Sequence, residues 1–363
     1  MSIISNYANR RAQLAQYLQA KQLDGMIVTH LTHVFYLSGF TGSNAALWIS
    51  ADGEARISTD GRYTTRIAQE VPDIPCTLGR DGAFALLEQV TAGKRIGFEA
   101  SYITVSALAA LEDSFSGHTF VPVRGEIERL RAVKTDAELQ ALRNVAAVAH
   151  EAFNGMLESE VVRPGVSERD IAADLEYRMR KLGSLKPSFD TIVASGPNSA
   201  LPHYDAGDRL LAVGDLVTID FGAFMNGYNS DTTRTLAVGQ PSEQLTEIYN
   251  VVLEAQLAGV EATEVGARLQ DIDATCRDII SKAGYGEYFV HSTGHGVGLD
   301  VHEAPYAATT GQGELEVGNT LTIEPGIYIP GVGGVRIEDT LVVTASGTEN
   351  LCPLPKQLLQ VGV

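Results

Sequence analysis

The sequence predicts an α+β fold built in two parts. Strand and helix patterns alternate over roughly residues 1–125, which is typical of an α/β layer. After residue 125, strands and helices are interleaved without the regular rhythm of a parallel βαβ sheet, which favours a curved antiparallel sheet with helices outside it. The length of 363 residues also exceeds the usual size of one domain. We therefore expect an N-terminal domain over 1–125 and a second domain over 126–363.

The first part is expected to begin with a helix over 6–21, which stops near Gly25. A second helix is expected over 101–115. Short runs of β-branched and apolar residues predict the strands between them. The expected strands are 26–29, 45–49, 55–58 and 95–98.

The second part is expected to follow the breaker-rich segment 121–125 with a long helix. Thr135 and Glu138 have the spacing of a capping box at its start. Ser167 begins another helix, whose apolar face carries Ile171, Leu175 and Met179 at i, i+4 spacing. Further helices are expected over 242–259 and 266–283, and further strands over 191–194 and 340–344.

Composition and charge exclude several classes of protein. The net charge of -18 argues against nucleic acid or an anionic membrane as a partner. No apolar run approaches the about 20 residues of a membrane span, and the first residues lack the pattern of a signal peptide. The three cysteines, Cys76, Cys276 and Cys352, form neither a metal spacing nor an even disulfide set. We expect buried free thiols and a cytoplasmic protein.

A predicted β-hairpin brings Asp220 and Asp231 together. Residues 217–219 favour a strand, and Asn226-Gly227 is a strong signal for a two-residue turn. With that turn, Asp231 lies opposite Gly222, and Asp220 points to the same face as Gly222. Two carboxylates so close repel each other unless a cation or a proton lies between them. Taken alone, the segment is equally typical of two surface aspartates near a polar turn.

Three further ligand candidates lie later in the chain. His295 sits in a glycine-rich stretch, where the backbone can come close to a site. Glu324 ends an apolar run, and Glu338 precedes a strand-like run. The turn-rich segment 330–334 lies between the two glutamates. A second hairpin with its midpoint at Gly331 is therefore expected.

Four carboxylates and one imidazole suit two divalent cations that are bridged by shared carboxylates. Oxygen-rich ligation with one nitrogen favours Mn²⁺, Fe²⁺ or Co²⁺, and Zn²⁺ is also open. A structural zinc site would instead consist mostly of Cys and His with every position filled.

The segments around these residues resemble the motifs of the pita-bread metallopeptidases. Five segments in the family's order and spacing carry the resemblance: Thr-Ile-Asp-Phe-Gly at 218–222, Tyr-Asn-Ser-Asp-Thr-Thr-Arg at 228–234, His-Ser-Thr-Gly-His-Gly-Val-Gly at 291–298, Thr-Ile-Glu-Pro-Gly at 322–326 and Val-Arg-Ile-Glu-Asp at 335–339. The chain is most similar to the proline-specific branch, the Xaa-Pro dipeptidases (prolidases) and Xaa-Pro aminopeptidases. The resemblance implies a C-terminal pita-bread domain with two related halves, preceded by a creatinase-type α/β domain.

The resemblance also implies a ligand set for two cations. Asp220 and Asp231 would bind one, with Asp231 as a bridge. His295 and Glu324 would bind the other, with Glu338 as the second bridge. A water activated between the cations would attack the peptide carbonyl, and Glu324 would carry the proton to the departing proline nitrogen.

Four other residues acquire expected roles from the same resemblance. His203 and His302 would lie near the scissile bond, His291 near the proline pocket, and Arg336 in the hydrogen-bond network of the active site. Whether Tyr228 is a packed aromatic or a site residue stays open. At the place of Tyr306 some prolidases carry an arginine, and its absence here favours longer Xaa-Pro-Yaa substrates over strict dipeptides.

The sequence therefore predicts an exopeptidase that uses two divalent cations, most consistent with Mn²⁺, to release the residue before a proline. The expected partners are proline-containing peptides and a second copy in a homodimer. A methionine aminopeptidase shares the five ligands but needs no such N-terminal domain. A creatinase-like amidinohydrolase or a non-enzymatic binding protein on this fold is expected to have lost ligands that are intact here.

Overall fold

The computed structural model describes residues 3–362, and contacts divide the chain into two compact units, Met1–Arg131 and Ala132–Val363. The sequence placed a boundary at 125/126, before helix α6 (Glu126–Ala132). The helix instead belongs almost wholly to the first unit, where Ile127 is buried and lines the same small cavity as Met26 and Val123. The Pro and Gly signals at 121–125 therefore end strand β6 (Thr119–Val123) and not the unit.

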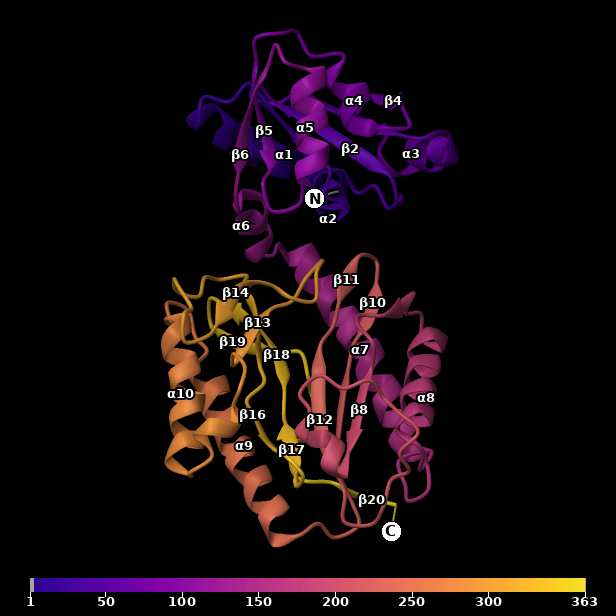
Figure 1. Cartoon of the computed structure of the whole chain (residues 1–363), viewed down its shortest axis with the longest axis vertical. Coiled ribbons are helices and arrows are strands. Elements are labelled where there is room, and N and C mark those ends of the chain that lie inside the picture. The colour runs from indigo at the N-terminus through magenta and orange to yellow at the C-terminus, as the bar shows by residue number, and fades with distance from the viewer. Residues whose placement is uncertain (1–2, 363) are drawn as a thin grey trace. The chain divides into compact units, whose positions relative to one another are not determined.

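The first unit contains a six-stranded mixed sheet with the order β4-β3-β2-β1-β5-β6 (Figure 1). β1 pairs in parallel with β5 and antiparallel with β2, so the expected alternation of strands and helices does not give a uniformly parallel sheet. Its other strands are β1 (Gly25–Val28), β2 (Ala45–Ser50), β3 (Ala55–Thr59), β4 (Cys76–Leu78) and β5 (Arg95–Glu99). Its other helices are α1 (Ile3–Ala20), α2 (Leu31–Ser38), α3 (Thr64–Glu70), α4 (Gly82–Leu87) and α5 (Val105–Ser114).

The core of this unit forms where α4 and α5 cover the sheet, with Leu86 and Leu111 packed against Ile27, Trp48 and Phe98. One expectation about this unit is wrong. Cys76 is exposed, whereas Cys276 and Cys352 are buried, and all three are free thiols. Cys76 differs because it lies on β4, the edge strand of the sheet, where neighbouring elements cover a side chain least.

The second unit carries its helices outside its strands. Figure 1 shows α8 on one side of the strands of this unit and α9 and α10 on the other. Helix α7 (Asp136–Glu158) begins with the predicted capping box of Thr135 and Glu138. Ser167 caps α8 (Glu168–Lys181), and Ser242 caps α9 (Glu243–Ala262). Helix α10 (Leu269–Lys282) packs along α9.

The strands of this unit pair antiparallel, except that β20 runs parallel to β12. They form a curved arrangement of short sheets because turns and breaks interrupt the long hairpins. The strands are β7 (Lys186–Pro187), β8 (Ile192–Ser195), β9 (Leu216–Phe221), β10 (Ala223–Met225), β11 (Tyr228–Asn229), β12 (Thr232–Val238), β13 (Gly294–Gly296), β14 (Glu303–Ala307), β15 (Thr320–Ile323), β16 (Gly326–Ile329), β17 (Gly333–Arg336), β18 (Asp339–Thr344), β19 (Gly347–Asn350) and β20 (Gln360–Val361).

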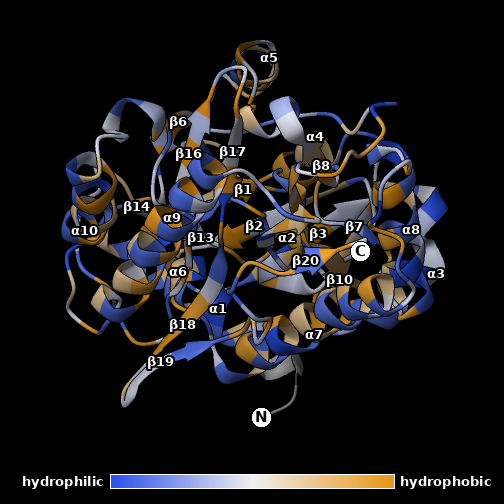
Figure 2. Cartoon of the chain, turned by 90° about the horizontal axis from the view of Figure 1, so that it is seen from below, coloured by the Kyte–Doolittle hydropathy of each residue, from blue (hydrophilic) through white to orange (hydrophobic). Residues whose placement is uncertain are grey.

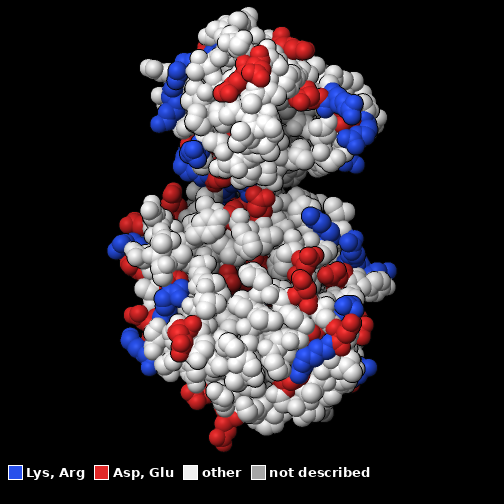
Figure 3. All heavy atoms as spheres, viewed as in Figure 1, with Lys and Arg blue, Asp and Glu red and all other residues white. Residues whose placement is uncertain are grey.

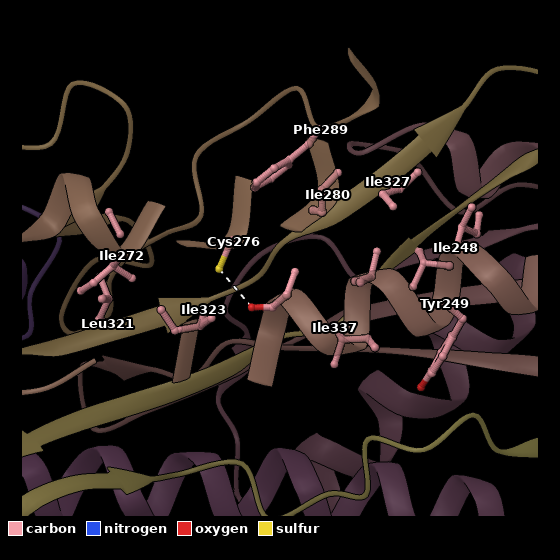
Figure 4. Close-up of a cluster of buried hydrophobic side chains, with 14 of the residues drawn as sticks. Ile248, Tyr249, Ile272, Cys276, Ile280, Phe289, Leu321, Ile323, Ile327 and Ile337 are labelled. Carbon is pink, nitrogen blue, oxygen red and sulfur yellow. Dashed lines mark hydrogen bonds between the residues drawn. The ribbon is translucent and has the colours of Figure 1, made fainter. Parts of the chain in front are cut away.

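A core of fully buried aliphatic residues joins α9 and α10 to the strands (Figure 4). Ile323 and Ile337 belong to this core, and each directly precedes a glutamate of the predicted metal set. Because neighbouring residues of a strand point to opposite faces, burying these isoleucines turns Glu324 and Glu338 away from the helices. In Figure 2, blue hydrophilic residues lie on the outer side of α8, and orange hydrophobic residues mark the interior.

The surface is acidic, as the net charge of -18 requires. Figure 3 shows Asp and Glu side chains recessed in the middle of the second unit as well as on its rim. No helix in the described part of the chain is both long and apolar enough to cross a lipid bilayer.

Candidate metal centre

The first hairpin has the register that the sequence predicted. Asn226 and Gly227 both have positive φ, at 54° and 88°, which is the backbone of a type I′ turn. From that turn one register runs through both strand pairs and places Thr233 opposite Asp220. The same register places Asp231 across from Gly222, where an added Cβ would lie 1.9 Å from a carbonyl oxygen. Asp231 therefore lies two residues along its strand from Thr233, the residue opposite Asp220, and both aspartates are on the same face of the hairpin.

The second hairpin is interrupted but keeps a single register. Ile323 pairs with Asp339 before the break, and Gly326 pairs with Arg336 after it. Continuing this register across the break places Glu324 opposite Glu338, with Gly331 at the tip as expected. The proline after Glu324 lacks an N–H, which explains why the ladder is broken there.

His295 approaches the carboxylates from strand β13. Its backbone N–H donates to Thr322 Oγ1 at 3.0 Å, and Gly294 lets the two strands touch, since an added Cβ would be 1.7 Å from the Thr322 carbonyl oxygen. Nδ1 lies 3.1 Å from the Gly296 carbonyl, so Nδ1 carries the proton in the neutral ring. Nε2 then presents its lone pair to Glu324, 3.2 Å away, and Asp231, 3.7 Å away. This is the usual tautomer of a metal-binding histidine.

These residues form three overlapping groups of potential ligands, in each of which the ligand atoms lie within 4.8 Å of one another. The groups are Asp220, Asp231 and Glu338; His295, Glu324 and Glu338; and Asp231, His295 and His302. The first two share Glu338, and Asp231 belongs to the first and the third. Shared carboxylates of this kind suit two adjacent cations.

The electrostatics of the cluster favour bound cations. Burial first, and then the charges of neighbouring carboxylates, raise the pKa of Asp231 and Glu338 well above their usual values. Burial also raises the pKa of Asp220, although the adjacent Arg336 opposes it. Burial acts in the same direction on Glu324, but the hydrogen bond and charge of His295 outweigh it and lower the pKa of Glu324 to about 2. A cation would replace the protons that Asp231 and Glu338 otherwise hold.

The donor set fits divalent cations in a second respect. Asp220 Oδ1 is buried and has no hydrogen-bond partner among the described residues, while Oδ2 accepts a hydrogen bond from Arg336 Nη2 at 2.6 Å. A buried carboxylate oxygen without a donor is costly unless a cation meets it. Residues Asp220, Asp231, His295, Glu324 and Glu338 would hold such cations.

Arg336 and His291 are linked by a tyrosine that sequence reasoning missed. Arg336 Nη1 donates to Tyr328 Oη at 2.8 Å, and the hydroxyl in turn faces His291 Nε2 at 2.8 Å. His291 Nδ1 lies 2.8 Å from the Ser292 carbonyl, so the ring is a neutral acceptor at Nε2. Burial lowers the pKa of His291 and raises that of Tyr328 to about 12, which keeps both groups neutral near pH 7.

Two threonines were also missed. Thr233 Oγ1 donates to Glu338 Oε2 at 2.7 Å and lies 3.1 Å from Arg336 Nε, so it orients a predicted bridge. Thr322 Oγ1 contacts Glu324 Oε1 at 3.2 Å. The available signal was position, because each threonine lies two residues from a ligand on the same strand face.

His302 and His203 are exposed side chains beside the cluster. The His302 ring stands edge-on to the His295 ring, with centroids 4.3 Å apart. Burial and the charge of His295 lower the pKa of His302. His203 lies on the loop after β8, near enough to influence the pKa of both His291 and His302. The structure thus brings all the predicted site residues to one region.

Tyr228 lies apart from this cluster. Its buried hydroxyl donates to Glu138 Oε1 at 3.1 Å, which favours the packed aromatic of the two alternatives. Tyr306 pairs with His295 across strands β13 and β14, and its side chain is 47% exposed.

Family comparisons agree with this geometry. Residues 140–345 match the model of metallopeptidase family M24, and residues 10–133 match the creatinase/prolidase N-terminal domain. The chain belongs to metallopeptidase family M24. The predicted pita-bread and creatinase-type domains are thereby confirmed, and the chain is a hydrolase. Enzymes of this family use divalent metals, and the groups of carboxylates and histidines described above could bind them.

The chain is similar to relatives over nearly its whole length. It is 45% identical to the uncharacterized peptidase YqhT of Bacillus subtilis, over 93% of this chain and 96% of that one. A structure named Xaa-Pro dipeptidase from Bacillus anthracis superposes with a TM-score of 0.92 at 41% identity, over 98% and 100% of the chains. The structure of an X-Pro aminopeptidase from Thermotoga maritima superposes with a TM-score of 0.88 at 33% identity, over 97% of this chain and 99% of that one.

The raised pKa of Glu338 predicts that its charge destabilises the metal-free protein. A carboxyl whose pKa is raised by folding lowers stability as the pH rises from the unfolded value through the folded one. At pH 8, with a chelator present, Glu338→Gln should therefore raise the melting temperature by a few degrees, since 1 kcal/mol corresponds to about 2–4 °C in a domain of this size. Differential scanning calorimetry measures the shift.

Asp339 is the matched control because it is the next residue along the chain and is equally buried. Despite its burial, Arg234 at 2.8 Å and Lys356 at 2.7 Å lower its pKa. Its stabilising effect is complete at pH 8 and is lost only as the pH falls through the folded pKa. Asp339→Asn should thus lower the melting temperature, by an amount that reflects about 3–5 kcal/mol. A Glu338→Gln protein as destabilised as Asp339→Asn would contradict the assignment.

Proposed function

We propose that the chain is an exopeptidase that uses two divalent cations to cleave the bond between an N-terminal residue and proline. The observation that carries the proposal is the register of the two hairpins, which brings four carboxylates together with His295 in overlapping groups whose potential ligand atoms lie within 4.8 Å of one another. The names of the relatives, Xaa-Pro dipeptidase and X-Pro aminopeptidase, support the proline specificity.

The cations, when bound, would polarise the peptide carbonyl and lower the pKa of a water molecule. The oxygen-rich donor set with one nitrogen supports Mn²⁺ as the resident metal, with Co²⁺, Fe²⁺ and Zn²⁺ as alternatives. The chain's own residues would supply proton transfer and orientation.

Glu324 is assigned to proton transfer. Its carboxylate lies among the predicted ligands and can accept the proton of the water that adds to the carbonyl. The proton is then passed to the proline nitrogen, which must be protonated before it can leave. Thr322 Oγ1, which donates to Glu324 Oε1 at 3.2 Å, holds the carboxylate in place.

His302 and His203 are assigned to the carbonyl oxygen, and the Arg336–Tyr328–His291 chain to the proline ring. His302 and His203 are exposed beside the cluster and can donate an N–H to the negative charge that develops on that oxygen. Arg336 also fixes Asp220, so the wall of the proline pocket and the metal centre share one support.

Metal dependence is the most direct expectation. Elemental analysis after loading with Mn²⁺ or Co²⁺ should give close to two ions per chain, and removal by a chelator should abolish hydrolysis of Ala-Pro peptides. A peptide of the Met-Ala type serves as the specificity control, because a methionine aminopeptidase would cleave it. Full activity in the chelated protein would refute the proposal.

Replacing His302 should affect the transition state more than metal binding. We expect His302→Ala to lower kcat by about 10²-fold or more, the effect of losing one oxyanion donor. The metal content should stay at the wild-type value. A fall in metal content would instead make His302 a ligand, which its place in the third ligand group allows. If His302→Ala keeps the wild-type kcat, His302 is neither an oxyanion donor nor a metal ligand needed for catalysis.

Substrate length should not be limited to dipeptides. A buried substrate carboxylate needs a cation or several donors. Tyr306 carries no charge at neutral pH, and the nitrogens of Arg336 already bond to Asp220, Tyr328, Thr233 and Pro202. We expect Ala-Pro-Ala to be cleaved with a kcat/KM at least equal to that of Ala-Pro. A preference of about a hundredfold for the dipeptide would show that another cation binds the carboxylate.

A homodimer in the cytoplasm remains a prediction drawn from the family resemblance. Sedimentation analysis of the purified protein tests the dimer.

A further inference from the structure

Glu168 is a fully buried carboxylate that takes no part in the metal centre. It is the first residue of α8, where an acid also interacts favourably with the helix dipole. That role alone would leave its oxygens facing solvent. Instead both oxygens are used by the segment 195–207, the loop after β8 that carries His203.

The hydrogen bonds of Glu168 reach both ends of this loop. At the near end, Oε1 accepts from the backbone N–H and hydroxyl of Ser195, at 2.8 and 2.7 Å, and from Asn198 Nδ2 at 3.0 Å. At the far end, Oε2 accepts from the Tyr204 hydroxyl at 2.8 Å and from the Gly207 N–H at 3.4 Å. A single buried carboxylate therefore bonds residues at both ends of the loop.

His203 lies between two fixed neighbours as a result. Tyr204, the next residue, is held by Glu168. The carbonyl of Pro202, the preceding residue, accepts from Arg336 Nη1 at 3.3 Å, and Arg336 is also bonded to Asp220. The imidazole itself is exposed, so its position depends on these two anchors. Without Glu168, Tyr204 would keep its bond to Asn198 Nδ2 at 2.8 Å but would lose its anchor in the buried carboxylate, while the Arg336 contact would still hold Pro202.

We propose that Glu168 is a positioning residue that sets the place of the His203 imidazole relative to the metal centre, and through it the rate of peptide cleavage. The catalytic consequence rests on the proposed function of His203, whereas the positioning of the ring does not. The side-chain hydrogen bonds described for Glu168 go to the loop 195–207 and not to the predicted metal ligands, so Glu168 acts through the loop.

Glu168→Gln tests this inference with little change in size. A glutamine amide can still accept from Ser195, and the Tyr204 hydroxyl can turn to accept from its NH₂ group. The NH₂ group then faces the N–H groups of Asn198 and Gly207, so these two contacts are lost and the far end of the loop is held less firmly. Tyr204→Phe is the second variant, since it removes the hydroxyl that donates to Glu168 and leaves the Glu168 charge in place. Asp174→Asn is the matched control: it changes a carboxylate of the same helix that pairs with Arg178 at 2.5 Å.

The first measurement reports position without catalysis. ¹³C-labelled histidine in the zinc-loaded protein gives ring signals for the eight histidines, and the His203 signal is the one missing in His203→Ala. In the wild type and in Asp174→Asn, its relaxation should be that of a side chain fixed to the protein. In Glu168→Gln and Tyr204→Phe, it should be the narrow signal of a mobile ring. An unchanged His203 signal in both variants would overturn the inference.

The second measurement is a double-mutant cycle on kcat/KM for an Xaa-Pro peptide. Glu168→Gln should lower kcat/KM by about tenfold in the wild type but by less than about twofold in the His203→Ala background, because residues that act as a unit are not additive. A merely structural effect would lower kcat/KM by the same factor in both backgrounds and would overturn the inference. If the wild type itself fails to cleave Xaa-Pro peptides, the proposed function fails, while the histidine signal still decides the positioning role of Glu168.

Discussion

Mutual repulsion among buried carboxylates is the constraint on which the second unit depends. Asp220, Asp231, Glu324 and Glu338 are crowded together, and burial alone pushes the pKa of each upward. The strands oppose this repulsion because their other face is fixed: Ile323 and Ile337 are held in the apolar core beneath α9 and α10. Moving one glutamate away would pull an isoleucine out of that core. Apolar packing thereby holds together carboxylates whose charges bound cations would neutralise.

Three predicted site histidines outside the metal set, His203, His291 and His302, share a second feature. Each lies on a loop, and a buried carboxylate lies next to each of these loops: Glu168 for His203, Asp273 for His291 and Glu303 for His302. Glu303 shows how such a carboxylate is itself held, since it pairs with the buried ammonium of Lys134 at 2.8 Å. Loops that carry chemistry are usually the most mobile parts of a fold. Here buried carboxylates hold the backbone of these loops, while the imidazoles of His203 and His302 stay exposed and that of His291 is half-buried against Tyr328.

Local chemistry made much of the site predictable. Asn226-Gly227 specifies its turn within two residues, and strand alternation then determines where Asp220 and Asp231 point. The role of Glu168 could not be predicted from the sequence, because its partners lie 27–39 residues further along the chain. Tyr328 was missed because its role depends on joining two separate segments, with Arg336 8 residues away and His291 37 residues away. The strand order of the mixed sheet in the first unit could not be predicted from local patterns, since it depends on contacts between distant segments.

The shared register of the second hairpin has a consequence for how this chain can change in length. Residues inserted at the Gly331 tip extend a loop and leave the pairing of β16 with β17 untouched. A single residue inserted between Glu324 and that tip shifts one arm against the other, and every side chain beyond it changes face. Glu324 and Glu338 would then point to opposite sides of the sheet. Insertions and deletions between the two glutamates are therefore tolerable during evolution only at the tip, or as compensated pairs, one in each arm.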